Sequence, residues 1–233
     1  MISKISALWE DILSFFFPDF CLGCGTRLSS PRRYLCSKCL ESLPRNTGYE
    51  ALFKSDERLQ GLIPYGELRS DLIFREESLT REIIHEIKYR KHPDLGYKLG
   101  RLYGEEHRRH HDFEDISMVI PIPVAPERLR KRGYNQSEYI ARGLAESLGI
   151  EMYTDLLHRR GGGTQTRRGK LSRWESLEGA FRCEPGCVMG RRLLLVDDIL
   201  TSGSTLIHAA RCLYEVGGAE SISFYTLAVD TYV

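Results

Sequence analysis

Two adjacent carboxylates and a loop of small residues occupy the segment VDDILTSGST, residues 196–205. Asp197 and Asp198 come at the end of an apolar run that predicts a buried strand. The loop after them predicts a helix N-terminus, where unpaired backbone N–H groups and the helix dipole bind phosphate. Its small residues are Thr201, Ser202, Gly203, Ser204 and Thr205.

A phosphate and two carboxylates repel each other unless the ligand holds them apart. A ribose 5-phosphate does so, because its ring separates the phosphate from the 2- and 3-hydroxyls, and carboxylates accept hydrogen bonds from hydroxyl groups. The segment therefore predicts that the two anionic sites contact opposite ends of one sugar phosphate. The alternative is that the acidic pair only caps the helix, for which one Asp is enough.

Four cysteines are spaced as C-x2-C-x11-C-x2-C, namely Cys21, Cys24, Cys36 and Cys39. Two such pairs offer the four thiolates that a tetrahedral zinc ion requires. Because all four ligands are protein thiolates, we expect a structural rather than a catalytic Zn²⁺ site. Cys183, Cys187 and Cys212 have no comparable set of partners, and Cys212 is expected on a helix as a small core residue.

Basic residues gather in the middle of the chain although the net charge is only +1, which predicts no overall attraction to nucleic acid or membrane. Lys88, Tyr89 and Arg90 end a predicted helix, and Lys88 and Arg90 are candidates for contact with a pyrophosphate or another substrate. The run Arg128, Arg130, Lys131 and Arg132 follows a predicted strand, so Arg132 and its neighbours are candidates for anion contact. For both groups the alternative is a solvated surface.

A long polar stretch with three consecutive glycines lies near residues 158–174. We expect residues 161–173 to form a lid that closes over the site and excludes water. Its candidate contacts are Thr164, Gln165, Arg167, Arg168 and Lys170. A flexible surface linker is the alternative.

The apolar periodicity predicts a domain in which strands and helices alternate. Helices are expected over 79–87, 95–103 and 135–148, with Asn135 and Glu138 as a capping box. Strands are expected over 118–122, 193–196 and 222–229, with a further strand near 152–157. The last forty residues read as strand, helix, strand, which is typical of a parallel sheet.

The turn-rich stretch 43–48 predicts a boundary between two parts. Residues 1–47 are expected to form an N-terminal helix and the zinc module, and residues 48–233 the α/β domain. Glu10 and Asp11 interrupt the first apolar stretch, which argues against a secretion signal, and no apolar run is long enough to span a membrane. We therefore expect a cytoplasmic protein.

Three segments of the chain resemble known protein families. The segment RRLLLVDDILTSGSTL resembles the phosphoribosyl diphosphate (PRPP) fingerprint of type I phosphoribosyltransferases. The segments VIPIPVAPERLRKRGYNQSEYIA and TQTRRGKLSRWESLEGAF, behind a four-cysteine module, are similar to the ComF family of competence proteins, and the resemblance covers nearly the whole chain.

The resemblance implies a four-cysteine zinc ribbon joined to a type I phosphoribosyltransferase-like parallel sheet flanked by helices. It implies that Asp197 and Asp198 are the catalytic pair that meets the ribose hydroxyls, and that residues 201–205 bind the 5-phosphate. Mg²⁺ is the expected bridge to the diphosphate of PRPP.

Two functions follow as expectations. The first is an enzyme, a glycosyltransferase of the pentosyl class, that transfers phosphoribosyl from PRPP to an unidentified nitrogen acceptor. The alternative is a non-catalytic module in DNA uptake that senses PRPP and binds single-stranded DNA or the competence helicase machinery. Its basic segments would hold the strand, and Tyr34, Tyr89 and Tyr134 would offer stacking surfaces.

Overall fold

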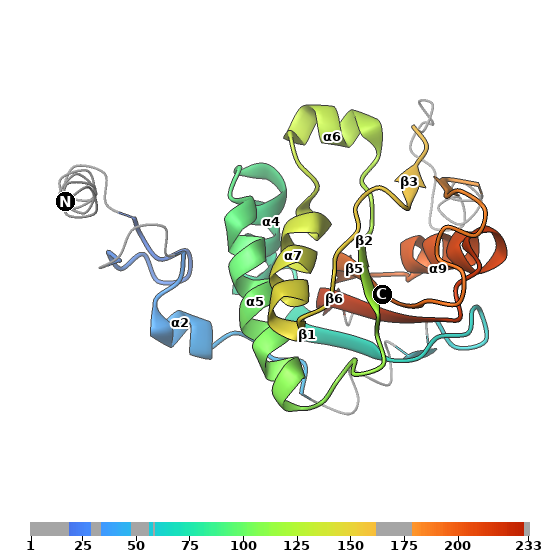
Figure 1. The fold of residues 1–233 in the computed structure, drawn as a ribbon. Helices are drawn as coiled ribbons and strands as arrows, with labels where there is room; N and C mark the ends of the chain where they lie inside the picture. The colour runs from blue at the N-terminus through green and yellow to red at the C-terminus, as the bar shows by residue number, and fades with distance from the viewer. Residues whose placement is uncertain (1–18, 29–33, 48–55, 58, 162–178, 231–233) are drawn as a thin grey trace, which may run out of the picture.

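The computed structural model describes residues 19–28, 34–47, 56–57, 59–161 and 179–230. At its centre lies a four-stranded sheet in the order β1-β6-β5-β2, in which all neighbouring strands are parallel (Figure 1). The strands are β1 Leu68–Phe74, β2 Met118–Pro121, β5 Arg192–Leu200 and β6 Ser221–Asp230. A small antiparallel pair, β3 His158–Arg159 and β4 Phe181–Arg182, lies outside this sheet.

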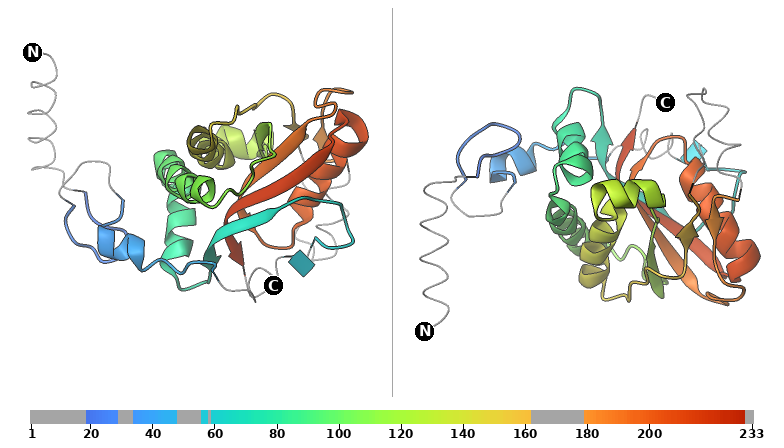
Figure 2. Two further views of the ribbon diagram at one scale, coloured as in Figure 1. Left: turned by 60° about the horizontal axis from the view of Figure 1, so that its bottom comes forward. Right: turned by 90° about the horizontal axis from the view of Figure 1, so that it is seen from above.

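Helices cover both faces of the sheet, and they are α4 Leu79–Tyr89, α5 Pro93–Arg109, α7 Gln136–Leu148 and α9 Ser204–Cys212. A short helix, α6 Pro126–Arg132, follows β2, and a π-helical turn, η1 Leu213–Gly217, extends α9. Figures 1 and 2 show α4, α5 and α7 on one side of the sheet and α9 on the other.

Strand β5 shows why the sheet is buried on both faces. Leu194 and Val196 pack with residues of α4, α5 and α7, whereas Leu193 and Leu195 pack with residues of α9. Successive side chains of a strand point to opposite faces, so a continuous apolar run is what a doubly covered parallel strand needs. This arrangement confirms the predicted α/β class.

Helices α5 and α7 cross with their backbones in close contact. A Cβ atom at Gly100 would lie 2.2 Å from the carbonyl oxygen of Ile140, and one at Gly143 would lie 2.1 Å from that of Tyr97. Only glycine fits at these two positions. The crossing sets the position of α7, whose first residues reach the acidic pair.

The structure corrects several predicted elements. The strand predicted over 193–196 continues to Leu200, so Asp197 and Asp198 lie within β5 rather than after it. The stretch 152–157 forms no strand, because only Met152 bridges to the sheet, opposite Val119. Strand β1 and helix α6 were not predicted.

The predicted capping box is half formed. The Asn135 side chain accepts a hydrogen bond from the Ser137 backbone N–H at 3.2 Å. Glu138 instead accepts from Arg142, 2.8 Å away on the next turn. The helix therefore starts where predicted, with one of the two capping interactions.

The four-cysteine segment and α2 Ser37–Glu41 lie beside α4 and α5, on the side away from α9 (Figures 1 and 2). Tyr34 donates a hydrogen bond to Asp94 at the start of α5, at 2.5 Å. After α2, the backbone of Arg45 forms an isolated antiparallel β-bridge with Leu72 of β1. The division at residue 47 stays a prediction, and the predicted N-terminal helix lies outside the described residues.

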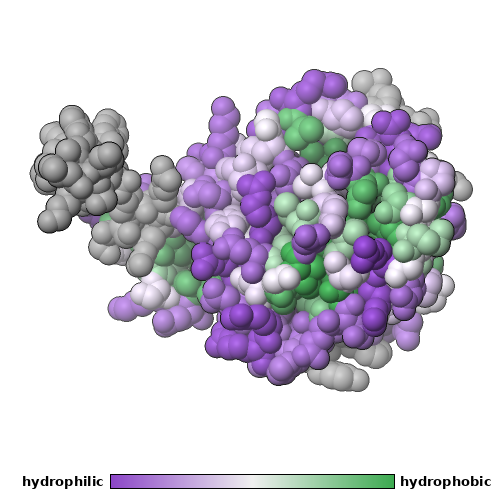
Figure 3. Space-filling model, viewed as in Figure 1, coloured by the Kyte–Doolittle hydropathy of each residue, from purple (hydrophilic) through white to green (hydrophobic). Residues whose placement is uncertain are grey.

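Surface hydrophobic residues form separate patches in the view of Figure 3, and hydrophilic residues follow the upper rim where α6 lies. In the described parts of the chain, no helix combines the length and the apolar character needed to cross a lipid bilayer.

Candidate functional site

The acidic pair lies level with the end of the neighbouring strand β2. Pro121, the last residue of β2, is paired with Val196 of β5. Beyond Val196, β5 is therefore paired only with β6, and its edge toward β2 is open. Asp198 is buried, with 3% of its surface exposed, and Asp197 is half-buried. Both carboxylates therefore lie at the carboxyl edge of a parallel sheet, the position at which such sheets bind ligands.

Asp198 is held by side chains from two helices. Lys88, in the last turn of α4, forms an ion pair with Asp198 Oδ2. Gln136, the first residue of α7, donates from Nε2 to Asp198 Oδ1 at 3.4 Å. The structure thus brings the predicted residue Lys88 directly to the acidic pair.

Asp197 has a different set of partners. Its Oδ1 accepts hydrogen bonds from the Ser137 hydroxyl at 2.8 Å and from the Asp198 backbone N–H at 2.9 Å. Burial, together with the neighbouring charge of Asp198, raises the pKa of Asp197 to about 7. A cation bound beside the pair would relieve this repulsion.

The predicted phosphate loop leads directly into α9. Gly203 is the N-cap of this helix with φ of 75°, a left-handed conformation that favours glycine. The hydroxyls of Ser202 and Ser204 lie 3.0 Å apart. Since the first N–H groups of a helix have no intrahelical acceptor, residues 201–205 offer both amide and hydroxyl donors at one place.

A basic cavity of about 350 Å³ opens between the end of α4 and helix α6. Five cationic side chains and two tyrosines line it within the described chain, and the cations are Lys88, Lys91, Arg128, Lys131 and Arg132. The predicted residues Lys88 and Arg132 therefore meet at one cavity. Arg90 does not line it, because its side chain is 67% exposed and lies 3.9 Å from Glu86.

A chain of contacts links Arg132 to the acidic pair. Arg132 donates to Gln136 Oε1, and the same amide donates to Asp198. The guanidinium of Arg132 also lies 5.2 Å from the ring centroid of Tyr89, within the range of a cation–π contact. One glutamine thus couples the basic cavity to the carboxylates.

A larger cavity, of about 600 Å³, lies at the amino end of β1 and is lined by residues 56, 60–61 and 63–69. This is the opposite edge of the sheet from the acidic pair, and none of the predicted site residues lines it. The predicted lid contacts, Thr164 to Lys170, lie outside the described residues.

Arg159 on β3 was missed by the sequence analysis. Its half-buried guanidinium lies 5.3 Å from the ring centroid of Phe181. Burial and the charge of Arg128 lower the pKa of Arg159, whereas Asp197 acts in the opposite direction. The charges of Arg128, which lines the basic cavity, and of Asp197 therefore both act on Arg159. Its position in the sequence HRR, just before the three glycines, was the available signal.

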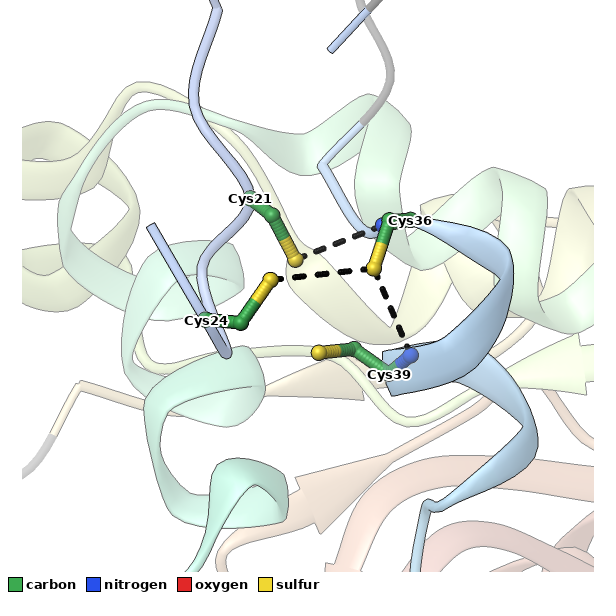
Figure 4. Close-up of side chains that lie close together, drawn as sticks. All are labelled: Cys21, Cys24, Cys36 and Cys39. Atoms are coloured by element: carbon green, nitrogen blue, oxygen red, sulfur yellow. Dashed lines mark hydrogen bonds between the residues drawn. The ribbon is translucent and has the colours of Figure 1, made fainter. Parts of the chain in front are cut away.

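The four predicted cysteines converge at the N-terminal module, with their sulfur atoms pointing toward one another (Figure 4). All four sulfurs lie within 4.8 Å of one another, and those of Cys24 and Cys36 are 3.8 Å apart. A tetrahedral ion with Zn–S bonds of about 2.3 Å separates its sulfur ligands by about 3.8 Å. The cluster can therefore hold zinc.

The pKa shifts of the thiols agree with a site for a cation. Burial of Cys21 is outweighed by hydrogen bonds from the backbone of Cys36, Cys24 and Gly23, which lower its pKa to about 6. The interaction with Cys21 raises the pKa of Cys39 to about 12. The first thiolate forms readily, and the later ones need a bound cation to displace their protons.

A family model and several known proteins are similar to this chain. The family model "Phosphoribosyl transferase domain" matches residues 135–231, which include the acidic pair, the predicted phosphate loop and the start of α7. The chain is similar to "Competence protein ComFC" of Bacillus subtilis (strain 168), with 26% identity over 219 residues, covering 89% of this chain and 82% of that protein.

A second relative is "DNA utilization protein YhgH" of Salmonella typhimurium, 30% identical over 141 residues. The match covers 59% of this chain and 62% of that protein, so it spans less than two thirds of this relative. A solved structure titled "Structure of the allosteric regulatory enzyme of purine biosynthesis" aligns with a TM-score of 0.41 and 20% identity, over 61% of this chain and 30% of that one.

Proposed function

Because the chain is a ComF-family phosphoribosyltransferase-like protein, we propose that it binds PRPP with magnesium at the carboxyl end of β5. The observation that carries this proposal is the position of the acidic pair, in which Asp198 is buried, just before the glycine-capped N-terminus of α9. The two features lie within the segment that matches the phosphoribosyl transferase domain.

In this proposal each part of the site contacts one part of PRPP. The amide and hydroxyl donors of residues 201–205 bind the 5-phosphate, and Asp197 and Asp198 accept hydrogen bonds from the ribose hydroxyls. Binding of the diol replaces Lys88 at Asp198 and frees its ammonium group. Lys88 and Arg132 then face the diphosphate, on which negative charge develops as it leaves.

Magnesium fits the oxygen donors of this site. Mg²⁺ is usually held by one or two carboxylates together with substrate phosphates, and Asp197 and Asp198 offer such carboxylates. When bound, the ion would neutralise charge on the diphosphate. Asp197, with its raised pKa, must lose its proton before it can take part.

The reaction in this proposal is transfer of the phosphoribosyl group to a nitrogen acceptor. The names of the relatives, a competence protein and a DNA utilization protein, support a biological role in DNA uptake. A protein that binds PRPP without turnover is the second candidate, since the same acidic pair and loop would serve a sensor.

Calorimetry with PRPP and magnesium tests the binding site. We expect the double variant Asp197→Asn with Asp198→Asn to lose at least about a hundredfold in affinity, because neutral amides accept hydroxyl hydrogen bonds less strongly and hold no cation. Circular dichroism should show that the variant is folded. Asp155→Asn, at an exposed position, is the matched control.

Unchanged PRPP affinity in the double variant would refute the site. Release of pyrophosphate that requires PRPP, magnesium and an added acceptor would support the enzyme. Tight binding without pyrophosphate release would support the sensor.

A further inference from the structure

Tyr34 is attached to both pairs of cysteines in the four-cysteine module. The backbone N–H of Leu22, the residue after Cys21, donates to the Tyr34 carbonyl oxygen at 2.9 Å. Two residues after Tyr34, the backbone N–H of Cys36 donates to the Cys21 sulfur at 3.3 Å. The geometry of the cysteine cluster therefore determines where the side chain of Tyr34 lies.

The side chain of Tyr34 contacts the start of helix α5. Its hydroxyl donates to Asp94 at 2.5 Å, and the hydroxyl oxygen can accept from His92 Nδ1, which is 3.3 Å away. His92 is the N-cap residue of α5, but its own side chain makes no capping hydrogen bond. The Tyr34 hydroxyl thus holds the first residues of α5 where a local side-chain cap is missing.

The module also packs on the start of helix α4. A Cβ atom at Gly23 would lie 2.9 Å from Leu79 Cδ2, so the chain between the first two cysteines touches the first residue of α4. Leu22 and Leu40 of the module pack against the core cluster to which α4, α5 and α7 contribute. The module therefore contacts both α4 and α5, the two helices that flank one short turn.

This turn, residues 90–92, forms part of the wall of the basic cavity. Lys91, in its middle, lines the cavity and has φ of 60°, a left-handed conformation that is costly for a residue with a side chain. Such a conformation persists only where the surrounding structure holds it. On the α4 side the Tyr134 hydroxyl donates to the Ile87 carbonyl oxygen at 2.6 Å, and on the α5 side Tyr34 holds the chain.

We infer that the four-cysteine module positions the wall of the PRPP site through Tyr34, so that loss of a metal ion held by its thiolates lowers the affinity for PRPP. The inference rests on the proposed function, in which the basic cavity receives the diphosphate. Tyr34 does not line the cavity, so it acts through the start of α5 and the turn, which place Lys91 beside the diphosphate. Without a cation the thiols keep their protons or repel one another, and the cluster loses the geometry that holds Tyr34.

Hydrogen exchange of the full chain without PRPP, followed by mass spectrometry, tests the positioning. Tyr34→Phe keeps the ring and loses the hydroxyl, so we expect residues 88–95 to exchange about threefold or more faster than in the wild type, because the start of α5 loses its cap. Tyr153→Phe is the matched control. It loses a hydroxyl–carboxylate hydrogen bond of 2.6 Å to Glu151 at a residue that does not line the cavity, and should leave this exchange unchanged.

Calorimetry with PRPP and magnesium tests the consequence for binding. We expect Tyr34→Phe to bind PRPP about threefold to tenfold more weakly, and Cys36→Ser, which lacks one thiolate of the cluster, to lose at least as much. If Tyr34 acts through the turn, its effect depends on Lys91. The double variant Tyr34→Phe with Lys91→Gln should therefore lose less affinity than the product of the two single losses, whereas a general loss of stability would leave the two effects independent.

The outcomes separate this inference from the proposed function. Exchange or PRPP affinity of Tyr34→Phe equal to that of the wild type overturns the inference, and so do independent losses in the double variant. If Cys36→Ser loses its whole fold, Tyr34→Phe alone decides. If the wild type itself does not bind PRPP, the proposed function fails, and the exchange of residues 88–95 decides whether Tyr34 positions the turn.

Discussion

Asp197 and Asp198 are neighbours in the sequence but have different surroundings. Successive residues of a strand point to opposite faces, so Asp198 meets Lys88 and Gln136 on the side of α4 and α7, and Asp197 points to the other face of β5. Ser137 alone donates to the Asp197 side chain from α7. This difference leaves Asp198 with a cationic partner and Asp197 with the raised pKa.

The raised pKa of Asp197 predicts a pH-dependent stability in the absence of ligand. Between the unfolded value of about 3.9 and the folded value of about 7, the folded state binds more protons, so the free energy of unfolding falls as pH rises through this window. Asp197→Asn removes the titration. The variant should exceed the wild type by about 1–3 kcal/mol near pH 8, and this gap should shrink toward pH 5.

Urea unfolding followed by circular dichroism across this pH range measures the gap. Asp155→Asn, on the surface, should show the pH profile of the wild type. A difference between Asp197→Asn and the wild type that stays constant with pH would show that Asp197 does not titrate in this window.

At the scale of elements, helix α7 contacts both the acidic pair and helix α5. Its first turn brings Gln136 and Ser137 to the acidic pair, and its middle packs directly on the backbone of α5. The glycines of α5 at 96, 100 and 104 are spaced by four, which places them on one face of the helix. This spacing is the signal in the sequence that indicates the close crossing.

A methyl group at Gly143 tests the crossing. Two effects oppose each other in Gly143→Ala, because alanine favours a helix by about 1 kcal/mol, whereas overpacking costs about 1–3 kcal/mol. Here overpacking should win, since the new Cβ would lie 2.1 Å from the Tyr97 carbonyl oxygen and 2.6 Å from the Arg101 nitrogen, which are backbone atoms. We expect a lower Tm and weaker PRPP binding.

Thermal unfolding and calorimetry measure the two effects. Arg142→Ala, the adjacent and half-exposed position of the same helix, should leave PRPP affinity unchanged. A Gly143→Ala variant as stable as the wild type would mean that the helices can separate without loss.

At the scale of the whole molecule, a buried polar network joins the end of the cysteine module to the core. Arg45 lies 2.5 Å from Glu106 of α5 and 3.8 Å from Asp71 of β1. Asp71 also accepts from the Tyr225 hydroxyl of β6 at 2.6 Å, and His107 lies 3.3 Å from it. Since β1, β6 and α5 meet at this network, the module is anchored to the central sheet as well as to the surface of α4 and α5.

Loss of one thiolate tests whether the four-cysteine cluster binds zinc and how the cysteine module is anchored. Cys36→Ser should release the zinc ion and destabilise the module, because structural zinc supplies folding free energy that a small apolar core cannot replace. Metal analysis should fall well below one zinc per chain, and proteolysis should cut within residues 19–47 while the α/β domain persists. Cys187→Ser, outside the cluster, is the control.

Zinc content that stays at one per chain in Cys36→Ser would exclude this cysteine as a ligand. Loss of the whole fold would show that the module and the sheet unfold together, as the network around Asp71 permits.

The features of this protein that depend on short spacing can be predicted from its amino-acid sequence. The C-x2-C pairs, the strand–helix–strand order after residue 192 and the acidic pair before a glycine-containing helix start were all predicted, because turns, helices and strands impose local periods. The ends of α7 also follow from local signals, whereas β5 continues past the acids to Leu200, beyond its predicted end. Short or polar elements such as β1 and α6 carried too weak a period to be recognised.

The contacts between residues that are distant in the sequence are set by tertiary packing. Lys88, Arg132 and Gln136 come from three helices, and their approach to Asp198 depends on the strand order and on the glycine crossing of α5 with α7. The same packing directs Arg90 to solvent. A local pattern specifies the direction of a side chain on its own element, but the contacts between elements are set by how their buried faces pack together.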